Sequence, residues 1–427
     1  MQFQPKNELF FKKPQFYSKV FVFLFIMGIY SRYHLNLPSG IFIPNIISLI
    51  GGLGLLVSQG FRIRKNILIY FLGFTMLNLL LFGLGYITVG YNLIEVAKSF
   101  ILFEVSVFFA LVFYQELIYW RNEDLVQFYK KLTYFIIFLC FLDLFPIIHD
   151  LNMQIMGKQV MNVLENDRNF FFGTTLHRPY PLTTEPSHAA KLLFVVMPSW
   201  LYLSHEKDFK RFFLLCFVTL VIIRSPIILG IIGLGFLFFL AENKFKKTHL
   251  NYFAIGLILI ILIVLSSIAY LNVLGPRAVK IISGTDASTY ARVVRPWFVV
   301  KEVLLNHPFF GAGMGNTEYL AYLYQKKYLL LSLEGLDRGY LVFALLAPLA
   351  YMGLFGFIGH FFLVVRFLKP NSKRSLKFYL IVHYLLISIS MGAFLTINYW
   401  GYLFILFRVY SNIFPEKSSP ISYNKHW

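Results

Sequence analysis

Long apolar runs, separated by short polar segments, make up most of this chain. An apolar helix of about 20 residues crosses the hydrocarbon core of a bilayer. The pattern therefore predicts about twelve membrane-spanning helices, at residues 17–31, 41–60, 66–86, 93–119, 128–148, 187–204, 210–223, 226–241, 250–271, 339–365, 376–393 and 396–414.

Two polar segments, 150–186 and 272–338, are much longer than the other connections. Connections of this length are usually functional. The apolar residues Trp297, Val300 and Leu304 have helical spacing, so we expect the second loop to be partly helical. The predicted organisation is helices one to five (1–149), an outer loop (150–186), helices six to nine (187–271), a large outer loop (272–338), helices ten to twelve (339–414) and a cytoplasmic tail (415–427).

Composition supports a membrane protein. Hydrophobic residues make up 58% of the chain and charged residues 14%, and the mean hydropathy is +0.66. A soluble protein cannot bury so large an apolar fraction. The expected fold class is therefore an all-α polytopic membrane protein. Cys140 and Cys216 lie within apolar runs, and we interpret them as buried small hydrophobes and not as a disulfide or metal pair.

The formal net charge of +19 has two explanations. It would suit a nucleic-acid partner, but cytoplasmic loops of membrane proteins also collect Lys and Arg. We favour the second explanation and expect no nucleic-acid partner. With a cytoplasmic N-terminus, the short outer loops hold only Arg32 and Arg224. Both termini are therefore expected inside, and segments 150–186 and 272–338 outside.

Several polar residues lie alone within the predicted helices. Charged groups inside a membrane are functional candidates by default. Glu95 and Lys98 have the spacing of a helical pair. Asp143, His360 and His383 are interpreted as structural and not catalytic.

The first outer loop ends in a group of polar residues, Arg178, Glu185 and His188, at the start of the sixth predicted helix. Pro186 suits a first helical turn, where its missing N–H costs nothing. One interpretation is a capped helix start, with Glu185 interacting with the helix dipole. The other makes Glu185 or His188 a proton acceptor at the membrane surface. We favour the second, because a cap alone does not require all three residues.

Arginines gather in the second outer loop, at Arg277, Arg292 and Arg295. Guanidinium groups bind pyrophosphate in a bidentate manner and stay charged. Arg292 and Arg295 are three residues apart and would share one face of a helix. The alternatives are a solvated basic face or contact with anionic lipid headgroups. Arg224, between two short spans, either snorkels to the interface or reaches the same anionic group.

His307 begins the run His-Pro-Phe-Phe-Gly-Ala-Gly-Met-Gly-Asn at residues 307–316. This run is not the GxGxxG fingerprint, and the chain has no GxxxxGK[ST] motif, so we expect neither nucleotide binding nor ATP hydrolysis. Gly311 and Gly313 are expected to let the backbone turn tightly near a substrate.

Taken in order, these motifs resemble the bacterial O-antigen polymerase and O-antigen ligase superfamily, the Wzy/WaaL type. The resemblance rests on the Glu185-Pro-Ser helix start, the Arg224-Ser225 junction, Arg292, Trp297, the run 307–316, Gly339-Tyr-Leu and Met352-Gly-Leu-Phe-Gly356. As motifs it covers residues 170–360, and as topology the whole chain.

The resemblance implies a GT-C-like fold and a metal-independent, inverting glycosyltransferase without cofactors. Its substrate would be a glycan on undecaprenyl pyrophosphate, at the periplasmic face of the bacterial inner membrane. Arg224 and Arg292 would bind the pyrophosphate, with Arg178 and Arg295 as neighbouring candidates. Glu185 or His188 would be the catalytic base. The further candidate substrate contacts are Arg277, Trp297, His307, Gly311 and Gly313.

Two departures from the family pattern affect this assignment. The family often shows Ser-Arg at the short junction, whereas this chain has Arg224-Ser225. Ligases carry a His-Asn or Ser-His-Asn motif before the last long helix, whereas residues 336–340 are Leu-Asp-Arg-Gly-Tyr. The missing histidine favours a polymerase over a ligase. It also leaves the identity of the base open between Glu185 and His188.

A flippase for the same lipid-linked glycan is a further alternative. Arginines concentrated in outer loops favour surface chemistry over transport. The expected partners are the lipid-linked glycan, membrane lipids and a co-polymerase that regulates chain length.

Overall fold

The structure of the chain is a computed structural model. It describes residues 15–31, 34–36, 42–44, 46–156, 179–183, 186–204, 208–223, 225–242, 295–316, 319–320, 344–367, 374–390 and 394–410.

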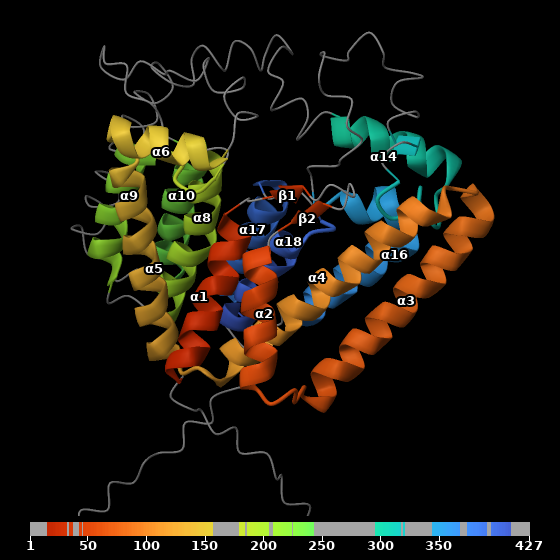
Figure 1. Cartoon of the computed structure of the whole chain (residues 1–427), viewed down its shortest axis with the longest axis horizontal. Coiled ribbons are helices and arrows are strands. Elements are labelled where there is room, and N and C mark those ends of the chain that lie inside the picture. Colours follow the sequence, from red (N-terminus) through yellow and green to blue (C-terminus); the bar gives the residue numbers. More distant parts are fainter. Residues whose placement is uncertain are drawn as a thin grey trace, which may run out of the picture.

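Helices joined by turns account for nearly all regular structure in these residues (Figure 1). The first group is α1 (Phe16–Tyr30), α2 (Ile46–Ser58), α3 (Lys65–Val89), α4 (Leu93–Tyr119), α5 (Asn122–Leu142) and α6 (Pro146–Met156). The second is α8 (Pro186–Ser204), α9 (Phe209–Ile223), α10 (Pro226–Glu242), α14 (Arg295–Asn306), α16 (Ala347–Phe367), α17 (Arg374–Ser390) and α18 (Ile397–Tyr410).

The prediction of a helical membrane protein is confirmed. Four helices in the described residues are long and apolar enough to cross a membrane: α3, α4, α5 and the Ala347–Val365 part of α16. α3 exposes a series of large apolar side chains, including Ile69, Leu72, Met76 and Leu80. A surface of this kind is unusual in water and suits contact with lipid tails.

One small element departs from the all-helical expectation. Strands β1 (His34–Asn36) and β2 (Phe42–Pro44) pair antiparallel, with Leu35 opposite Ile43. Each strand is only 3 residues long, too short to show the alternating pattern by which strands are recognised in a sequence.

Most predicted spans coincide with helices, and α4 has the predicted bounds 93–119. The predicted span 250–271 lies outside the described residues. The bounds predicted for the fifth span, 128–148, are wrong. α5 ends at Leu142, and a turn leads into α6 at Pro146. Proline is tolerated there because the first N–H groups of a helix have no partner within the helix.

α1 and α2 pack almost backbone to backbone. A Cβ atom on Gly28 would overlap the backbone of Ser48, and one on Gly51 would overlap the backbone of Phe25. Small residues permit this close approach between membrane helices, where packing takes over from the hydrophobic effect.

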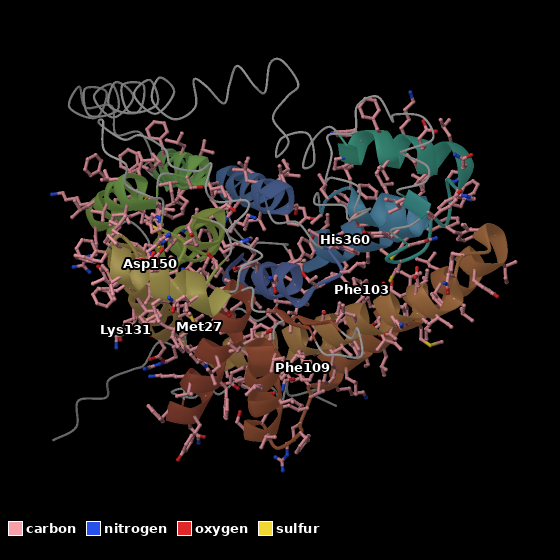
Figure 2. The ribbon with its side chains drawn as sticks, turned by 45° about the horizontal axis from the view of Figure 1, so that its top comes forward. Met27, Phe103, Phe109, Lys131, Asp150 and His360 are labelled. Atoms are coloured by element: carbon pink, nitrogen blue, oxygen red, sulfur yellow. The ribbon has the colours of Figure 1, made fainter. Side chains whose placement is uncertain are left out.

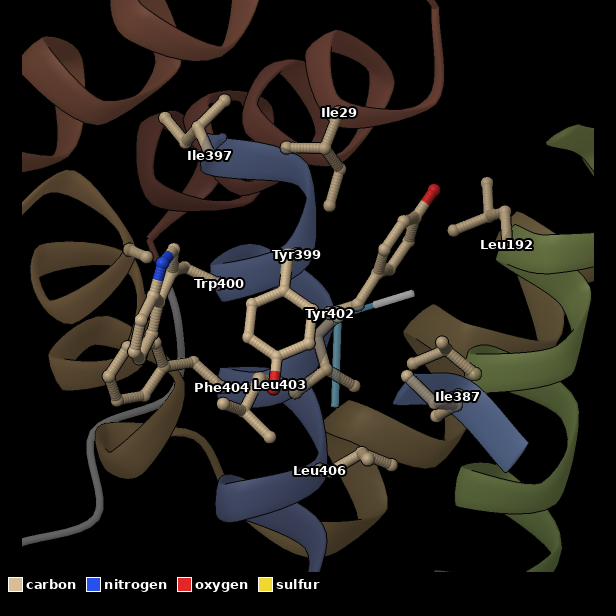
Figure 3. Close-up of a cluster of buried hydrophobic side chains, with 14 of the residues drawn as sticks. Ile29, Leu192, Ile387, Ile397, Tyr399, Trp400, Tyr402, Leu403, Phe404 and Leu406 are labelled. Atoms are coloured by element: carbon tan, nitrogen blue, oxygen red, sulfur yellow. The ribbon is translucent and has the colours of Figure 1, made fainter. Parts of the chain in front are cut away.

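α18 is buried along nearly its whole length, because every residue from 397 to 407 is buried. Figure 3 shows Ile29 of α1, Leu192 of α8 and Ile387 of α17 around it. The indole N–H of Trp400 is also satisfied, since it donates to the Phe394 carbonyl at 3.0 Å. α18 therefore joins the two halves of the bundle.

The last turn of α18 is fastened to the junction between α4 and α5. Arg408 donates from Nε to the Leu117 carbonyl at 2.8 Å and from Nη2 to the Trp120 carbonyl at 2.7 Å. Nη2 also lies 3.1 Å from Oδ1 of Asn122. Carbonyls at the end of a helix have no partner within the helix, so the guanidinium group caps α4.

Candidate functional site

Described parts of both predicted outer loops lie at the same end of the bundle. α6 and α14 are both at the top of Figure 1. α6 extends into the first of these loops, and α14 lies within the second. The candidate site is therefore built from the residues at this end.

α14 confirms the prediction that the second outer loop is partly helical. Val299 and Val303 are buried on the face that packs against α16. The other face is exposed and carries Trp297, Lys301 and Leu305, each four positions from the next. Trp297 was expected on the apolar face, but it is 57% exposed. It is consequently available to contact something outside the folded chain.

The run 307–316 forms a loop after α14 that turns repeatedly in the left-handed region. φ is 71° at Gly311, 93° at Gly313 and 67° at Gly315. Glycine adopts these angles without the strain that a Cβ atom causes. The tight turns at Gly311 and Gly313 are thus as predicted, whereas their contact with a substrate stays a prediction.

This loop docks into a break in α16. Gly353 has φ 64° and ψ −161°, which is not a helical conformation. A break of this kind leaves backbone N–H and C=O groups without helical partners. Within a membrane protein such groups must be satisfied by other parts of the protein.

Two carbonyls freed by the break accept hydrogen bonds from the loop. The N–H of Ala312 donates to the Ala350 carbonyl at 2.8 Å, and the N–H of Gly313 donates to the Tyr351 carbonyl at 3.1 Å. In a continuous helix these carbonyls would accept from residues 354 and 355.

The backbone N–H groups of residues 354 and 355 also form hydrogen bonds with the loop. The N–H of Leu354 donates to the Pro308 carbonyl at 2.9 Å, and the N–H of Phe355 donates to the Phe309 carbonyl at 3.4 Å. The loop therefore replaces two missing helical hydrogen bonds with four of its own.

The second side of the loop rests against α4 and the turn before it. A Cβ atom on Gly313 would lie 2.8 Å from the ring of Tyr91, and one on Gly315 would overlap Ser99. The Tyr91 hydroxyl donates to the Phe82 carbonyl. Burial, with a smaller contribution from Tyr86, raises the pKa of Tyr91 to about 12. Tyr91 therefore remains a neutral hydrogen-bond donor at physiological pH.

The two ends of the loop are also held. Nε2 of His307 lies 2.7 Å from the Tyr319 hydroxyl, and burial lowers the pKa of His307. Nδ2 of Asn316 donates to the Ala312 carbonyl at 2.9 Å. His307 is thus neutral at pH 7 and lies beside a hydroxyl, an arrangement that suits hydrogen bonding more than charge pairing.

His188 lies in a different part of the bundle. It is buried in the first turn of α8. α8 packs against α5 and α10, whereas α14 packs against α16. In Figure 1, α8 and α14 lie on opposite sides of the bundle. The described contacts do not join His188 to the loop 307–316.

Most of the predicted anion-binding residues fall outside the described residues. Arg295 begins α14, but its side chain is not described. The candidates outside the described residues are Arg178, Glu185, Arg224, Arg277 and Arg292. In the described part of the chain, no group of three or more His, Cys, Asp or Glu side chains could hold a metal ion.

Comparison with family models and curated sequences does not identify the chain. No protein-family model and no curated protein sequence matches the chain.

A group of polar residues that the sequence did not bring together lies at the end carrying α6. Asp143, interpreted from the sequence as a lone structural residue, accepts a hydrogen bond from the N–H of Tyr180 and lies beside His149. The only feature of the sequence that could have indicated this role is the position of Asp143, an acidic residue at the end of an apolar run and just before Pro146. His360 is buried beside the Tyr399 hydroxyl. His383 is buried beside the Phe194 carbonyl.

Proposed function

We propose that this chain is a polysaccharide polymerase. It would join undecaprenyl-pyrophosphate-linked oligosaccharide units into O-antigen or capsular polysaccharide at the periplasmic face of the bacterial inner membrane. The proposal includes twelve spans, a GT-C-like arrangement and both termini in the cytoplasm.

The observation that carries the proposal is the docking of the loop 307–316 into the break at Gly353. Two motifs of the family resemblance, the run 307–316 and Met352-Gly-Leu-Phe-Gly356, are thereby in direct contact. The contact holds α14 in place at the end of the bundle. α14 starts at Arg295, three residues after Arg292 in the sequence. A rigid helix start beside candidate anion-binding arginines supports a site that must hold a pyrophosphate.

The proposed reaction is a direct displacement. A hydroxyl of the acceptor sugar attacks the anomeric carbon of the donor glycan, and the bond from that carbon to the pyrophosphate oxygen breaks. The leaving group gains negative charge, which Arg224 and Arg292 stabilise electrostatically. Glu185 or His188 takes the proton of the attacking hydroxyl. The proposal therefore requires that one substrate be reached both from the start of α8 and from the segment before α14, although α8 and α14 lie on opposite sides of the bundle in Figure 1. One displacement inverts the anomeric configuration, whereas retention requires an enzyme nucleophile as well.

Purified protein incubated with lipid-linked repeat units alone tests the proposal. A polymerase gives a ladder of products on a gel. A flippase or a ligase without its acceptor gives none, and that result would overturn the proposal.

The arginine assignment needs a matched pair of variants. Arg292→Ala should abolish the ladder while protein levels stay normal. Lys301→Ala removes an exposed positive charge from α14 and should leave the ladder intact. Normal ladders from Arg292→Ala would refute the role of this arginine in pyrophosphate binding.

A further inference from the structure

A short segment, residues 179–183, precedes α8 and is held by hydrogen bonds from several parts of the bundle. We call these residues the strap. The strap lies between Arg178 and the candidate bases Glu185 and His188 in the sequence. The position of the strap therefore affects where the first turn of α8, with its candidate base, lies relative to the substrate.

Asp143 and His149 hold Tyr180 of the strap. Oδ2 of Asp143 accepts the Tyr180 backbone N–H at 2.7 Å. His149 lies between the two residues, with Nδ1 3.4 Å from the same Asp143 oxygen and Nε2 3.1 Å from the Tyr180 hydroxyl. The carboxylate and the imidazole thus fix both the backbone and the side chain of Tyr180.

A second residue of α6 and one residue of α1 also contact the strap. Asn152 donates from Nδ2 to the Tyr180 carbonyl at 3.2 Å and accepts the N–H of Leu182 at 3.0 Å. Asn152 is three residues from His149, so both lie on one face of α6. The Tyr30 hydroxyl of α1 donates to the Pro181 carbonyl at 2.6 Å. The strap is therefore held from α1, α5 and α6 together.

The backbone of the strap is strained. Leu182 has φ 56°, a left-handed conformation that is uncommon for residues with a Cβ atom. Such a conformation costs on the order of 1–3 kcal/mol and persists only where surrounding contacts impose it. Asn152 provides that constraint, because its side chain bonds both the Tyr180 carbonyl and the N–H of Leu182 itself.

We propose that Asp143 and His149 are positioning residues for the glycosyl transfer, acting through the strap on the first turn of α8. This inference rests on the proposed function. Neither residue has to touch the substrate. Their task is to fix Tyr180, and through it the strap that leads to His188, which is buried at the start of α8. A displacement of about 1 Å in a reacting group can lower a rate about a hundredfold.

The activity test compares variants in the purified polymerase assay. Asp143→Ala and His149→Ala should lower kcat by about a hundredfold and leave KM for the lipid-linked donor within about a factor of two, because donor binding is assigned to Arg224 and Arg292, which lie outside the strap. His149→Gln should recover part of kcat, because its amide can still reach the Tyr180 hydroxyl. Asp150→Asn removes an exposed carboxylate from the same helix, α6 (Figure 2), and should have no effect.

A second measurement tests the strap without any activity. A cysteine is introduced as Leu182→Cys and labelled with a maleimide in the intact protein. The native Cys140 and Cys216 are buried, so the label reports on position 182. Adding Asp143→Ala should raise the labelling rate by about tenfold or more, because local opening of the strap exposes the thiol.

The outcomes separate the two proposals. Faster labelling together with a loss of kcat supports the positioning role. Unchanged labelling shows that Asp143 does not hold the strap, and faster labelling with normal kcat shows that the strap does not position the reaction. Both results overturn the inference. If the wild-type protein makes no polymer, the positioning role fails with the proposed function, while the labelling rate still reports whether Asp143 holds the strap.

Discussion

Gly311 and Gly353 lie so close together that neither position has room for a Cβ atom. A Cβ atom on Gly311 would come within 2.6 Å of the Gly353 nitrogen, and one on Gly353 would overlap the backbone of Phe309. Both glycines also have positive φ. Their contact fixes α14 to α16, two helices that are separated in the sequence by about half of segment 272–338 and the start of the next predicted span.

Replacing either glycine should destabilise this region. Gly353→Ala adds a Cβ atom in a backbone conformation restricted almost entirely to glycine, and it pushes the loop 307–316 out of the break. We expect a loss of about 3 kcal/mol or more, seen as a lower unfolding temperature in detergent. Gly83→Ala is the control, because nothing lies within 4 Å of the added Cβ. Equal shifts for the two variants would contradict this account of the break.

His307 should make the stability of the loop depend on pH. Burial lowers its pKa from the ordinary value of 6.5, so the folded state favours the neutral ring. As pH falls below 6.5, the unfolded chain takes up a proton before the folded chain does, and stability declines until the lowered pKa is passed.

The comparison with His307→Gln isolates this contribution. Between pH 7.5 and pH 5, the wild-type unfolding temperature should fall further than that of the variant, which cannot titrate at this position. Other ionisable groups contribute equally to both proteins. Parallel curves would mean that His307 does not contribute to the pH dependence of stability.

Arg408 should contribute more to the stability of the fold than its partly exposed position indicates. Lysine at this position keeps the charge but loses the planar group that reaches Leu117, Trp120 and Asn122 together. Arg408→Lys is expected to cost about 1.5–3 kcal/mol, the usual contribution of hydrogen bonds to a charged group.

Arg121→Lys is the matched control for Arg408→Lys, measured by thermal unfolding in the same detergent. Arg121 pairs with Asp124 at 3.1 Å, but its side chain is 49% exposed, and exposed ion pairs contribute about 0–1 kcal/mol. A loss for Arg121→Lys as large as that for Arg408→Lys would show that the α4 cap has no special role.

The helices could be predicted from the sequence because each apolar run carries its own signal. The bounds of α4 follow directly from the polar residues that flank it. The spacing of Trp297, Val300 and Leu304 predicts the helix α14. It does not predict that Trp297 is exposed. Helical spacing identifies the apolar positions, but it does not show which of them another helix covers.

The break in α16 could not be predicted in this way. Gly353 lies inside an apolar run without a charged residue nearby, and glycine alone is common in membrane helices. The nearest proline, Pro348, is in the first turn of α16, where proline suits a helix start and does not signal a break. The conformation of Gly353 is stabilised by Pro308, Phe309, Ala312 and Gly313, which are about 40 residues away in the sequence. The family pattern did mark both segments, but not the contact between them.

The contacts of the strap depend on tertiary structure in the same way. Asp143 and Tyr180 are 37 residues apart, and no local pattern links them. The interpretation of Asp143 as a lone polar group was incomplete for this reason. The predicted span 128–148 also ran through the turn that brings Asp143 and His149 together.

Trp297 provides a test of α14 as part of the substrate site. Its side chain is 57% exposed, so Trp297→Ala should leave the unfolding temperature nearly unchanged. If Trp297 contacts the lipid-linked glycan, its loss should raise KM in the polymerase assay by about tenfold, since an aromatic contact contributes about 0.5–1.5 kcal/mol beyond its buried area.

The alternative for Trp297 is contact with the membrane surface, where tryptophan is enriched. Leu305 distinguishes the two, because it is 66% exposed on the same face of α14 but two turns further from Arg292. A substrate contact predicts that Leu305→Ala has a normal KM. If Leu305→Ala and Trp297→Ala raise KM equally, the exposed face of α14 acts through the bilayer, and Trp297 is not a substrate-binding residue.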